Sequence, residues 1–187
     1  QNVMASIAAL CMSGYDFYQV CEQVTTLKPV CGRMQVLAMQ PHQPQVVVDY
    51  AHTPDALKQV LQSLRPHCLG KLWCVFGCGG ERDRGKRPEM AAIAEQLADE
   101  VIVTSDNSRH ECEQQIAQDI LNGFACTEKI HVEMDRQLAV ERAVQSAIIN
   151  DMVLLAGLGH EIEQVRQHKV LRLSDAQLAE LAIKAKS

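Results

Sequence analysis

The stretch QVVVDYAHTPDAL, residues 45–57, contains the junction between a strand and a helix that decides the fold class. Three consecutive valines, Val46 to Val48, are apolar and β-branched, which is typical of a strand buried on both faces of a parallel sheet. Thr53 is a favourable helix N-cap, and Pro54 fits the first helical turn because that turn needs no backbone N–H from it. Apolar side chains then recur at helical spacing, at Leu57, Val60, Leu61 and Leu64. We therefore predict a buried strand, a short polar loop and an amphipathic helix.

The alternation of strand and helix continues along the chain. Further strands are predicted at 71–76, 101–104, 130–132, 152–156 and 168–173. Pro88 and Asp135 predict the starts of two helices between these strands. Ser174 and Gln177 have the spacing of a capping box, which predicts the start of a final helix. Such alternation is typical of an α/β domain with a mostly parallel sheet and helices on both faces.

Residues 1–30 have a different pattern from the rest of the chain. They predict two short helices, at 2–12 and 16–24, with Gly14 in the turn between them. Two short helices cannot bury a hydrophobic core alone, so we expect this segment to be the end of a domain that begins upstream. The absence of an initiating Met fits that expectation. Residues 31–187 are long enough to form one complete domain.

The composition argues against several classes of function. The chain carries a formal net charge of -5 without a block of Lys or Arg, which argues against binding nucleic acid or an anionic membrane surface. No apolar run approaches the length of a membrane span, and the N-terminus lacks the pattern of a signal peptide. The 8 cysteines are scattered without zinc spacing, which predicts thiols in a reducing cytoplasm and no metal site. We therefore expect a cytoplasmic protein with no nucleic-acid or membrane partner.

Four unusual loops follow four of the predicted strands. They are DYAHTPDA at 49–56, GCGGERDRGKRP at 77–88, DNSR at 106–109 and GLGHE at 157–161. In open parallel sheets, ligands bind in the crevice beyond the carboxyl ends of the strands. We therefore expect the four loops to converge on one binding site.

The first two loops carry groups suited to sugars and anions. In one interpretation, Asp49 accepts a hydrogen bond from a ribose hydroxyl, and the following helix presents its N-terminus to a phosphate. In the other, Asp49 only caps the turn. The cations of the second loop could bind a carboxylate or a phosphate. The alternative is that they form a solvated basic turn. These cations are Arg82, Arg84, Lys86 and Arg87. The loop lacks the GKS or GKT of a P-loop and the GxGxxG of a dinucleotide site, which disfavours a dehydrogenase.

The last two loops favour an amino-acid ligand. DNSR combines acceptors, an amide and a guanidinium within four residues, and a zwitterion with ammonium and carboxylate groups would suit that mixture. The alternative is an Asx-type turn at the start of a helix. In GLGHE, the glycines let the backbone approach a ligand closely, and Glu161 adds a carboxylate. We assign no catalytic role to His160.

Taken in order, five strings resemble the Mur ligase family. They are CGRM at 31–34, VVVDYAHTPDAL at 46–57, KLWCVFGCGGERDRGKRP at 71–88, DNSR at 106–109 and AGLGHE at 156–161. The resemblance is greatest to the members that add meso-diaminopimelate, the third peptide residue, to the peptidoglycan precursor. It covers essentially the whole chain, and its long strings are far more specific than a single glycine motif.

The resemblance implies a domain organisation and a reaction. Residues 1–30 would be the tail of a central ATPase domain, and residues 31–187 a C-terminal Rossmann-like domain that binds the amino acid. The family uses ATP and Mg²⁺ to convert a carboxylate into an acyl phosphate, which the incoming amine attacks. The substrate would be UDP-N-acetylmuramoyl-L-alanyl-D-glutamate. The main ATP and Mg²⁺ ligands are expected upstream, so we assign no catalytic or metal-binding residue here and expect a monomer that is inactive as an isolated fragment.

The resemblance also implies roles for individual residues. Arg109 would pair with the distal carboxylate of diaminopimelate, and Glu161 would accept from its distal ammonium. The full set of expected amino-acid contacts is Arg82, Asp106, Asn107, Ser108, Arg109, Gly157 and Glu161. The expected nucleotide contacts are Asn2, Arg33, Asp49 and His52.

Three positions depart from the family pattern, and two alternative functions stay open. Ser108 replaces the usual proline of DNPR, Leu158 replaces the lysine of GKGHE, and Ala5 replaces an asparagine expected near adenine. These departures leave open a diverged, non-catalytic ligand-binding module. The other alternative is a lysine-adding Mur ligase, which we disfavour because lysine lacks the second carboxylate that Arg109 would pair with.

Overall fold

The structure is a computed structural model that describes residues 2–27, 30–37, 42–128, 130–166, 169–172 and 174–186. The chain divides into two compact units, Gln1–Val30 and Cys31–Ser187. Over the described ranges, no helix combines the length and the apolar character that a membrane crossing requires. The assignment of the first unit to a central ATPase domain stays a prediction.

The first unit is a pair of helices. Helix α1 spans Asn2–Met12 and α2 spans Phe17–Val24, as the sequence predicts. The turn between them contains Gly14, whose φ of +93° suits glycine. Asp16 caps α2 by accepting a hydrogen bond of 3.0 Å from the backbone N–H of Gln19.

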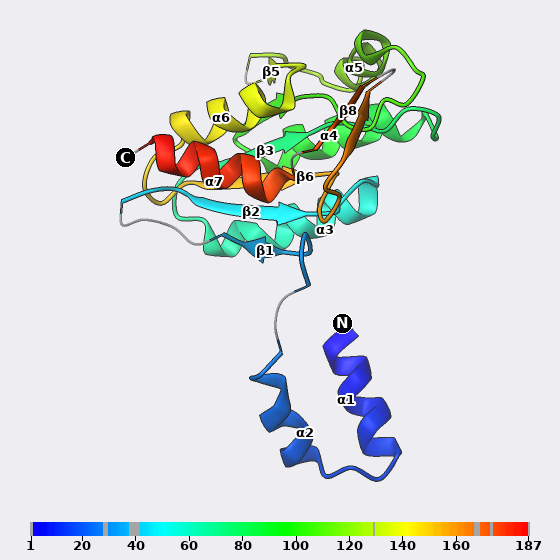
Figure 1. Cartoon of the computed structure of the whole chain (residues 1–187), viewed down its shortest axis with the longest axis vertical. Coiled ribbons are helices and arrows are strands. Elements are labelled where there is room, and N and C mark those ends of the chain that lie inside the picture. Colours follow the sequence, from blue (N-terminus) through cyan, green and yellow to red (C-terminus); the bar gives the residue numbers. More distant parts are fainter. Residues whose placement is uncertain are drawn as a thin grey trace. The chain divides into compact units, whose positions relative to one another are not determined.

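The second unit is built on a six-stranded sheet with the order β1-β2-β6-β3-β4-β5 (Figure 1). Strand β1 is antiparallel to β2, and the other neighbouring strands are parallel. The strands span Gln35–Val36 (β1), Gln45–Asp49 (β2), Leu72–Phe76 (β3), Glu100–Val103 (β4), Ile130–Val132 (β5) and Met152–Ala156 (β6). The predicted α/β fold with a mostly parallel sheet is therefore confirmed, and the short edge strand β1 is an addition to it.

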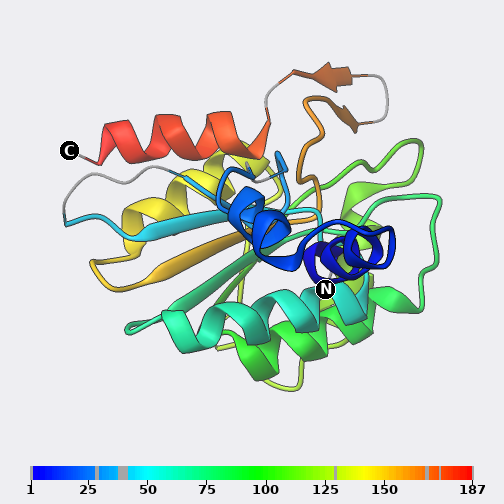
Figure 2. The same cartoon turned by 90° about the horizontal axis from the view of Figure 1, so that it is seen from below.

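Helices cover both faces of this sheet (Figure 2). One face carries α3 (Pro54–Leu64), α4 (Lys86–Leu97) and α5 (Glu113–Leu121), and the other carries α6 (Arg136–Ser146) and α7 (Asp175–Ala185). The valines of β2 pack against the helices on both faces of the sheet. Val47 belongs to the hydrophobic cluster of α3, α4 and α5, whereas Val46 and Val48 belong to that of α6 and α7.

Local capping signals set most helix starts. The Thr53 hydroxyl accepts from the backbone N–H of Ala56, and Ser174 forms the predicted capping box with Gln177. Helix α4 begins at Lys86, earlier than the prediction from Pro88. Pro88 lies in the first turn of α4, where its missing N–H removes no intrahelical hydrogen bond.

The predicted strand at 168–173 is shorter than expected and does not join the main sheet. Strand β8, at Lys169–Leu171, pairs antiparallel with β7, at Gln164–Arg166. Only two residues separate these strands in the sequence, and a parallel connection needs a dozen or more. His168 and Leu173 lie outside the described residues.

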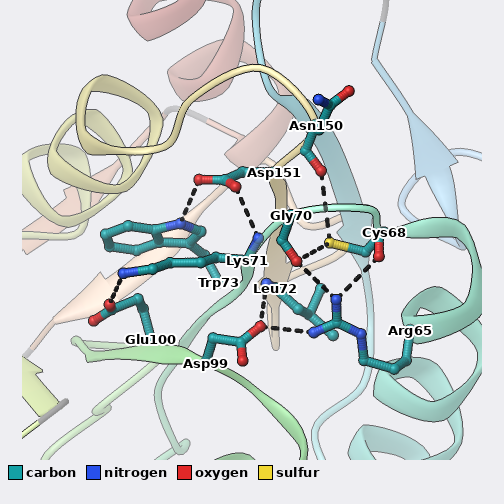
Figure 3. Close-up of polar contacts among 10 residues, drawn as sticks. All are labelled: Arg65, Cys68, Gly70, Lys71, Leu72, Trp73, Asp99, Glu100, Asn150 and Asp151. Carbon is teal, nitrogen blue, oxygen red and sulfur yellow. Dashed lines mark hydrogen bonds and ion pairs between the residues drawn. The ribbon is translucent and has the colours of Figure 1, made fainter.

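The amino ends of β3 and β6 are fixed by a polar network (Figure 3). Asp99 accepts from the backbone N–H of Leu72 at 2.8 Å and pairs with the Arg65 guanidinium at 2.6 Å. Asp151 accepts from the backbone N–H of Lys71 at 2.8 Å. Two buried or half-buried carboxylates thus satisfy backbone donors at this edge of the sheet. The opposite edge carries the four polar loops.

Candidate functional site

The four loops line one pocket of about 410 Å³ at the carboxyl ends of β2, β3, β4 and β6. This is the convergence that the strand–helix alternation predicts. The lining residues are Tyr50, His52, Thr53, Pro54, Gly79, Arg82, Asp83, Lys86, Asp106, Asn107, Arg109, Gly157 and Glu161.

Six of the seven expected amino-acid contacts line the pocket, and Ser108 does not. Ser108 is buried, and its hydroxyl donates to the Glu113 carboxylate at 3.1 Å. Its side chain therefore contacts the first residue of α5 and not the pocket.

Asp106 is packed against the glycine of the last loop. One carboxylate oxygen, Oδ1, accepts from the backbone N–H of Asn107 at 2.5 Å. A Cβ at Gly157 would lie 2.5 Å from the other oxygen, Oδ2, and the Gly157 φ is +113°. Burial raises the pKa of Asp106. This position therefore requires glycine and leaves Asp106 at the wall of the pocket.

Asn107 connects three segments of the site. Its Nδ2 donates to Oε2 of Glu161 at 2.5 Å, and its Oδ1 accepts from the backbone N–H of Val165 in β7 at 2.6 Å. Both ends of the amide are therefore used, which orients Asn107 and holds one Glu161 oxygen at the pocket.

Arg109 is held by one guanidinium nitrogen. Its Nη1 donates to the carbonyls of Gly80 at 2.8 Å and Asn107 at 3.3 Å. Its backbone has a φ of +51°, an uncommon value for a residue with a side chain. Among the described residues, Nη2 and Nε have no hydrogen-bond or ion-pair partner. The Arg109 guanidinium therefore keeps donors for an anionic ligand while its position is fixed.

Arg87 has a structural role, which neither of the two predictions for this loop, a ligand-facing cation or a solvated basic turn, includes. Its side chain is fully buried and forms ion pairs with Glu111 and Asp119 at 2.7–2.8 Å. Glu111 also accepts from the backbone N–H of Glu81 and pairs with Arg84. The hydrogen bonds from Arg87 lower the pKa of Glu111 to about 2. This network ties the GCGGERDRGKRP loop to the segment after DNSR.

A second buried cation supports the strand ends from the other face of the sheet. The Arg136 guanidinium forms two hydrogen bonds of 2.7 Å with the Asp175 carboxylate. It also donates to the carbonyls of Ser105 at 3.0 Å and Ala156 at 2.9 Å. These two carbonyls lie where the DNSR and GLGHE loops begin, so α6 and α7 position both loops.

The expected nucleotide contacts are divided between the units. In the second unit, His52 lines the pocket, and the Arg33 guanidinium lies 4.6 Å from the centre of the Tyr50 ring. Asp49 is buried, and its Oδ2 accepts from the backbone N–H of Met34 at 2.7 Å. The side chain of Asn2 lies outside the described residues.

Comparison with known proteins decides the family. The model of the Mur ligase glutamate ligase domain matches residues 32–159. The chain belongs to the Mur ligase family. Two curated relatives carry the name UDP-N-acetylmuramoyl-L-alanyl-D-glutamate--2,6-diaminopimelate ligase. The Haemophilus influenzae (KW20 / Rd) protein is 47% identical over 95% of this chain, and the Coxiella burnetii protein is 50% identical over 97%. The chain spans 36% and 37% of these two relatives' lengths.

Solved structures agree with this membership of the Mur ligase family. A structure with the same ligase name is 40% identical, covers 99% of this chain and has a TM-score of 0.78. This chain covers 38% of that protein. The UDP-N-acetylmuramate-alanine ligase of Thermotoga maritima shares the fold, with a TM-score of 0.69 at 22% identity over 98% of this chain and 36% of its own length.

The three departures from the expected Mur ligase pattern lie in different parts of the chain. Leu158 is buried at 2% exposure, and Ser108 is directed to Glu113. Ala5 is an exposed residue of α1 in the first unit. Neither Ser108 nor Leu158 is therefore among the side chains that line the pocket.

Two supporting residues of this Mur ligase domain, Tyr50 and Glu111, were not predicted from the sequence. Tyr50 lines the pocket, as does Lys86, whose Nζ donates to the His52 carbonyl at 2.8 Å. Glu111 forms the ion network with Arg87. Tyr50 lies at the end of the predicted strand and within the DYAHTPDA loop, which is the feature of the sequence that could have indicated its role. The role of Glu111 depends on partners 24 residues away, which no local spacing indicates.

In the described ranges, no group of three or more His, Cys, Asp or Glu side chains is placed to hold a metal ion. The eight cysteines are free, and burial raises the pKa of Cys74 and of Cys78 to about 12. At neutral pH these two thiols are therefore protonated core side chains.

Proposed function

We propose that this chain is the C-terminal part of an ATP-dependent ligase that adds meso-diaminopimelate to UDP-N-acetylmuramoyl-L-alanyl-D-glutamate. The observation that carries the proposal is the placement of Arg109 and Glu161 on one pocket, with unused guanidinium donors on Arg109. The identity to diaminopimelate ligases over nearly the whole chain supports it.

The charges of the pocket complement those of diaminopimelate. Arg109 supplies donors for the distal carboxylate in the paired geometry that guanidinium groups favour. Glu161 and Asp106 supply acceptors for ammonium groups, and both lie in the pocket lining. Arg82 is exposed and has no ion pair within the described part of the chain, so it is a second cation for a ligand carboxylate. A ligand with two ammonium and two carboxylate groups uses all four side chains.

The chain's own residues bind and orient the amine that forms the new amide bond. ATP supplies the phosphoryl group that turns the substrate carboxylate into an acyl phosphate. The exposed Arg33 fits an ATP phosphate, and His52 lies at the pocket. For Mg²⁺, the described residues provide no ligand cluster, so we place its ligands upstream. Orientation of the amine toward the acyl phosphate is the contribution of this domain.

The lysine-adding alternative leaves one cation without a partner. Lysine has an amine but no distal carboxylate, so bound lysine would leave the free donors of Arg109 unsatisfied within the pocket. The non-catalytic alternative draws on the departures at Ala5, Ser108 and Leu158. Against it, the four charged side chains that the proposal uses, Arg82, Asp106, Arg109 and Glu161, all line the pocket.

The deciding experiment uses the full-length protein that contains this chain. It is incubated with ATP, Mg²⁺, the UDP-linked dipeptide and either meso-diaminopimelate or lysine, and ADP and the tripeptide product are quantified. We expect product with diaminopimelate and about a hundredfold lower kcat/KM with lysine, because the half-buried Arg109 would lose its charged partner. A preference for lysine would support the first alternative, and binding of diaminopimelate without turnover would support the second.

A further inference from the structure

Tyr50 contacts residues from both sides of the pocket. It follows β2 directly, and its hydroxyl donates to Oε1 of Glu161 at 3.0 Å. Its ring lies beneath the Arg33 guanidinium, 4.6 Å from the ring centre. Glu161 belongs to the expected amino-acid contacts and Arg33 to the expected nucleotide contacts. Tyr50 thus contacts members of both groups.

The Glu161 carboxylate is held by two donors from different loops. Oε1 accepts from Tyr50, and Oε2 accepts from Asn107 at 2.5 Å. A carboxylate with one donor can rotate about its side-chain bonds, whereas two donors from separate loops fix its plane. Each oxygen keeps acceptor capacity for a ligand ammonium.

The Tyr50 ring is closely surrounded. The ring centres of His52 and His160 lie 4.5 Å and 4.9 Å from its own. A Cβ at Gly159 would lie 2.5 Å from the Tyr50 Cβ, so the GLGHE loop packs directly on this residue. Burial and the hydrogen bond to Glu161 raise the pKa of Tyr50, so its phenol stays protonated and donates at neutral pH. The hydroxyl therefore has a fixed position and a fixed role as donor.

We propose that Tyr50 is a positioning residue that couples the two sides of the pocket. Its hydroxyl orients Glu161 toward the distal ammonium of the amino acid, and its ring supports Arg33 on the nucleotide side. The proposal rests on the proposed function, because it takes Glu161 as the ammonium contact. Tyr50 itself touches no reacting atom in this scheme and acts through its two neighbours.

The hydroxyl and the ring are separated by two substitutions in the full-length ligase. Tyr50→Phe removes only the hydroxyl, so we expect the KM for diaminopimelate to rise about tenfold, equivalent to about 1.4 kcal/mol, while the KM for ATP stays within about twofold. Tyr50→Leu also removes the ring, so both KM values are expected to rise. Ser63→Ala is the control, because it removes an exposed hydroxyl of α3 that does not line the pocket.

A double-mutant cycle distinguishes positioning from a general structural effect. In a Glu161→Ala background there is no carboxylate to orient, so Tyr50→Phe is expected to lower kcat/KM for diaminopimelate less than twofold, against about tenfold in the parent. A structural role predicts the same fold-change in both backgrounds and a lower Tm for Tyr50→Phe. Equal fold-changes, or an unchanged diaminopimelate KM in Tyr50→Phe, would overturn the proposal.

A wrong substrate assignment can be distinguished from a wrong role for Tyr50. The parent ligase is first assayed with diaminopimelate and lysine. If it uses only lysine, the substrate assignment fails, and the Tyr50 cycle is repeated with lysine, whose side-chain ammonium also requires an acceptor. If it uses diaminopimelate and the cycle shows no coupling, only the Tyr50 proposal fails.

Discussion

The Arg87 guanidinium and the Glu111 carboxylate form a bidentate ion pair that joins two loops of the binding site. Nη1 lies 2.8 Å from Oε1, and Nη2 lies 2.8 Å from Oε2. Arg87 is fully buried, so its charge depends on Glu111 and Asp119 for compensation. The pair therefore links the fold's stability to the shape of the pocket.

Removal of the Glu111 carboxylate is expected to destabilise the C-terminal unit. Glu111→Ala leaves the buried Arg87 with Asp119 as its remaining carboxylate partner, and we expect a loss of about 3 kcal/mol in the free energy of unfolding. Urea denaturation of this chain measures the loss. The control is Glu163→Ala, which breaks the exposed pair with Arg172 and should cost less than about 1 kcal/mol. Equal effects of the two substitutions would contradict the assigned role.

The same carboxylate predicts a pH dependence of stability. The folded-state pKa of Glu111 is lowered to about 2 from an ordinary value of 4.5. The Glu111 carboxylate therefore makes its full contribution to the free energy of unfolding above pH 4.5. That contribution is lost as the pH falls toward the folded-state pKa. The difference in the free energy of unfolding between the parent and Glu111→Gln should therefore shrink as the pH falls from 5 to 3. Urea denaturation of both proteins at each pH measures this difference. A difference that is constant over this interval would count against the pair.

Arg109 is expected to select the amino acid through its geometry as well as its charge. Arg109→Ala in the full-length ligase should lower kcat/KM for diaminopimelate about a hundredfold, within the range for a hydrogen bond between charged groups. Arg109→Lys should recover little, because a lysine ammonium cannot form the paired contact. Arg172→Ala is the control, because Arg172 is 82% exposed. Unchanged kinetic constants for diaminopimelate in Arg109→Ala would remove the basis of the substrate assignment.

Gly157→Ala tests the close contact between the last loop and Asp106. The new Cβ would lie 2.5 Å from Oδ2, and a φ of +113° is strained for an alanine. We expect a stability loss of about 1–3 kcal/mol together with weaker diaminopimelate binding, measured by calorimetry. Gly14→Ala shares the unfavourable φ but has open space around it, so ligand binding should survive that change.

The isolated chain is expected to lack ligase activity. No GKS or GKT loop occurs in its sequence, and the described residues contain no cluster of metal ligands. ADP release with all substrates present measures this directly for the 187-residue chain. Turnover by the isolated chain would contradict this prediction.

The sequence predicts those parts of the fold that depend on nearby residues. Three adjacent valines mark β2, and Ser174 with Gln177 marks the start of α7, because strand burial and helix capping are local effects. Loops at the ends of parallel strands meet for topological reasons, which is why the pocket could be anticipated.

Side-chain roles within one loop depend on distant partners. Arg82 and Arg87 lie in the same basic loop, yet Arg82 lines the pocket and Arg87 is buried against Glu111. Their spacing does not distinguish the two, because the difference arises from residues of another loop and of α5. Strand β7 and its pairing with β8 were not predicted for a different reason. Both strands are three residues long, too short for a periodic pattern.

The network around Asp99 and Asp151 gives the sheet a fixed end at the opposite end of the strands from the four polar loops. These carboxylates hold the start of β3, whereas Arg109, Glu161 and Tyr50 lie in loops that follow other strands. A change of amino-acid preference can therefore be sought by exchanging residues in the loops while the anchored end is left intact. The domain can in this respect be used as a scaffold for redesign. New amino-acid selectivity would be introduced in the DNSR loop, and Asp99 and Asp151 would be left unchanged.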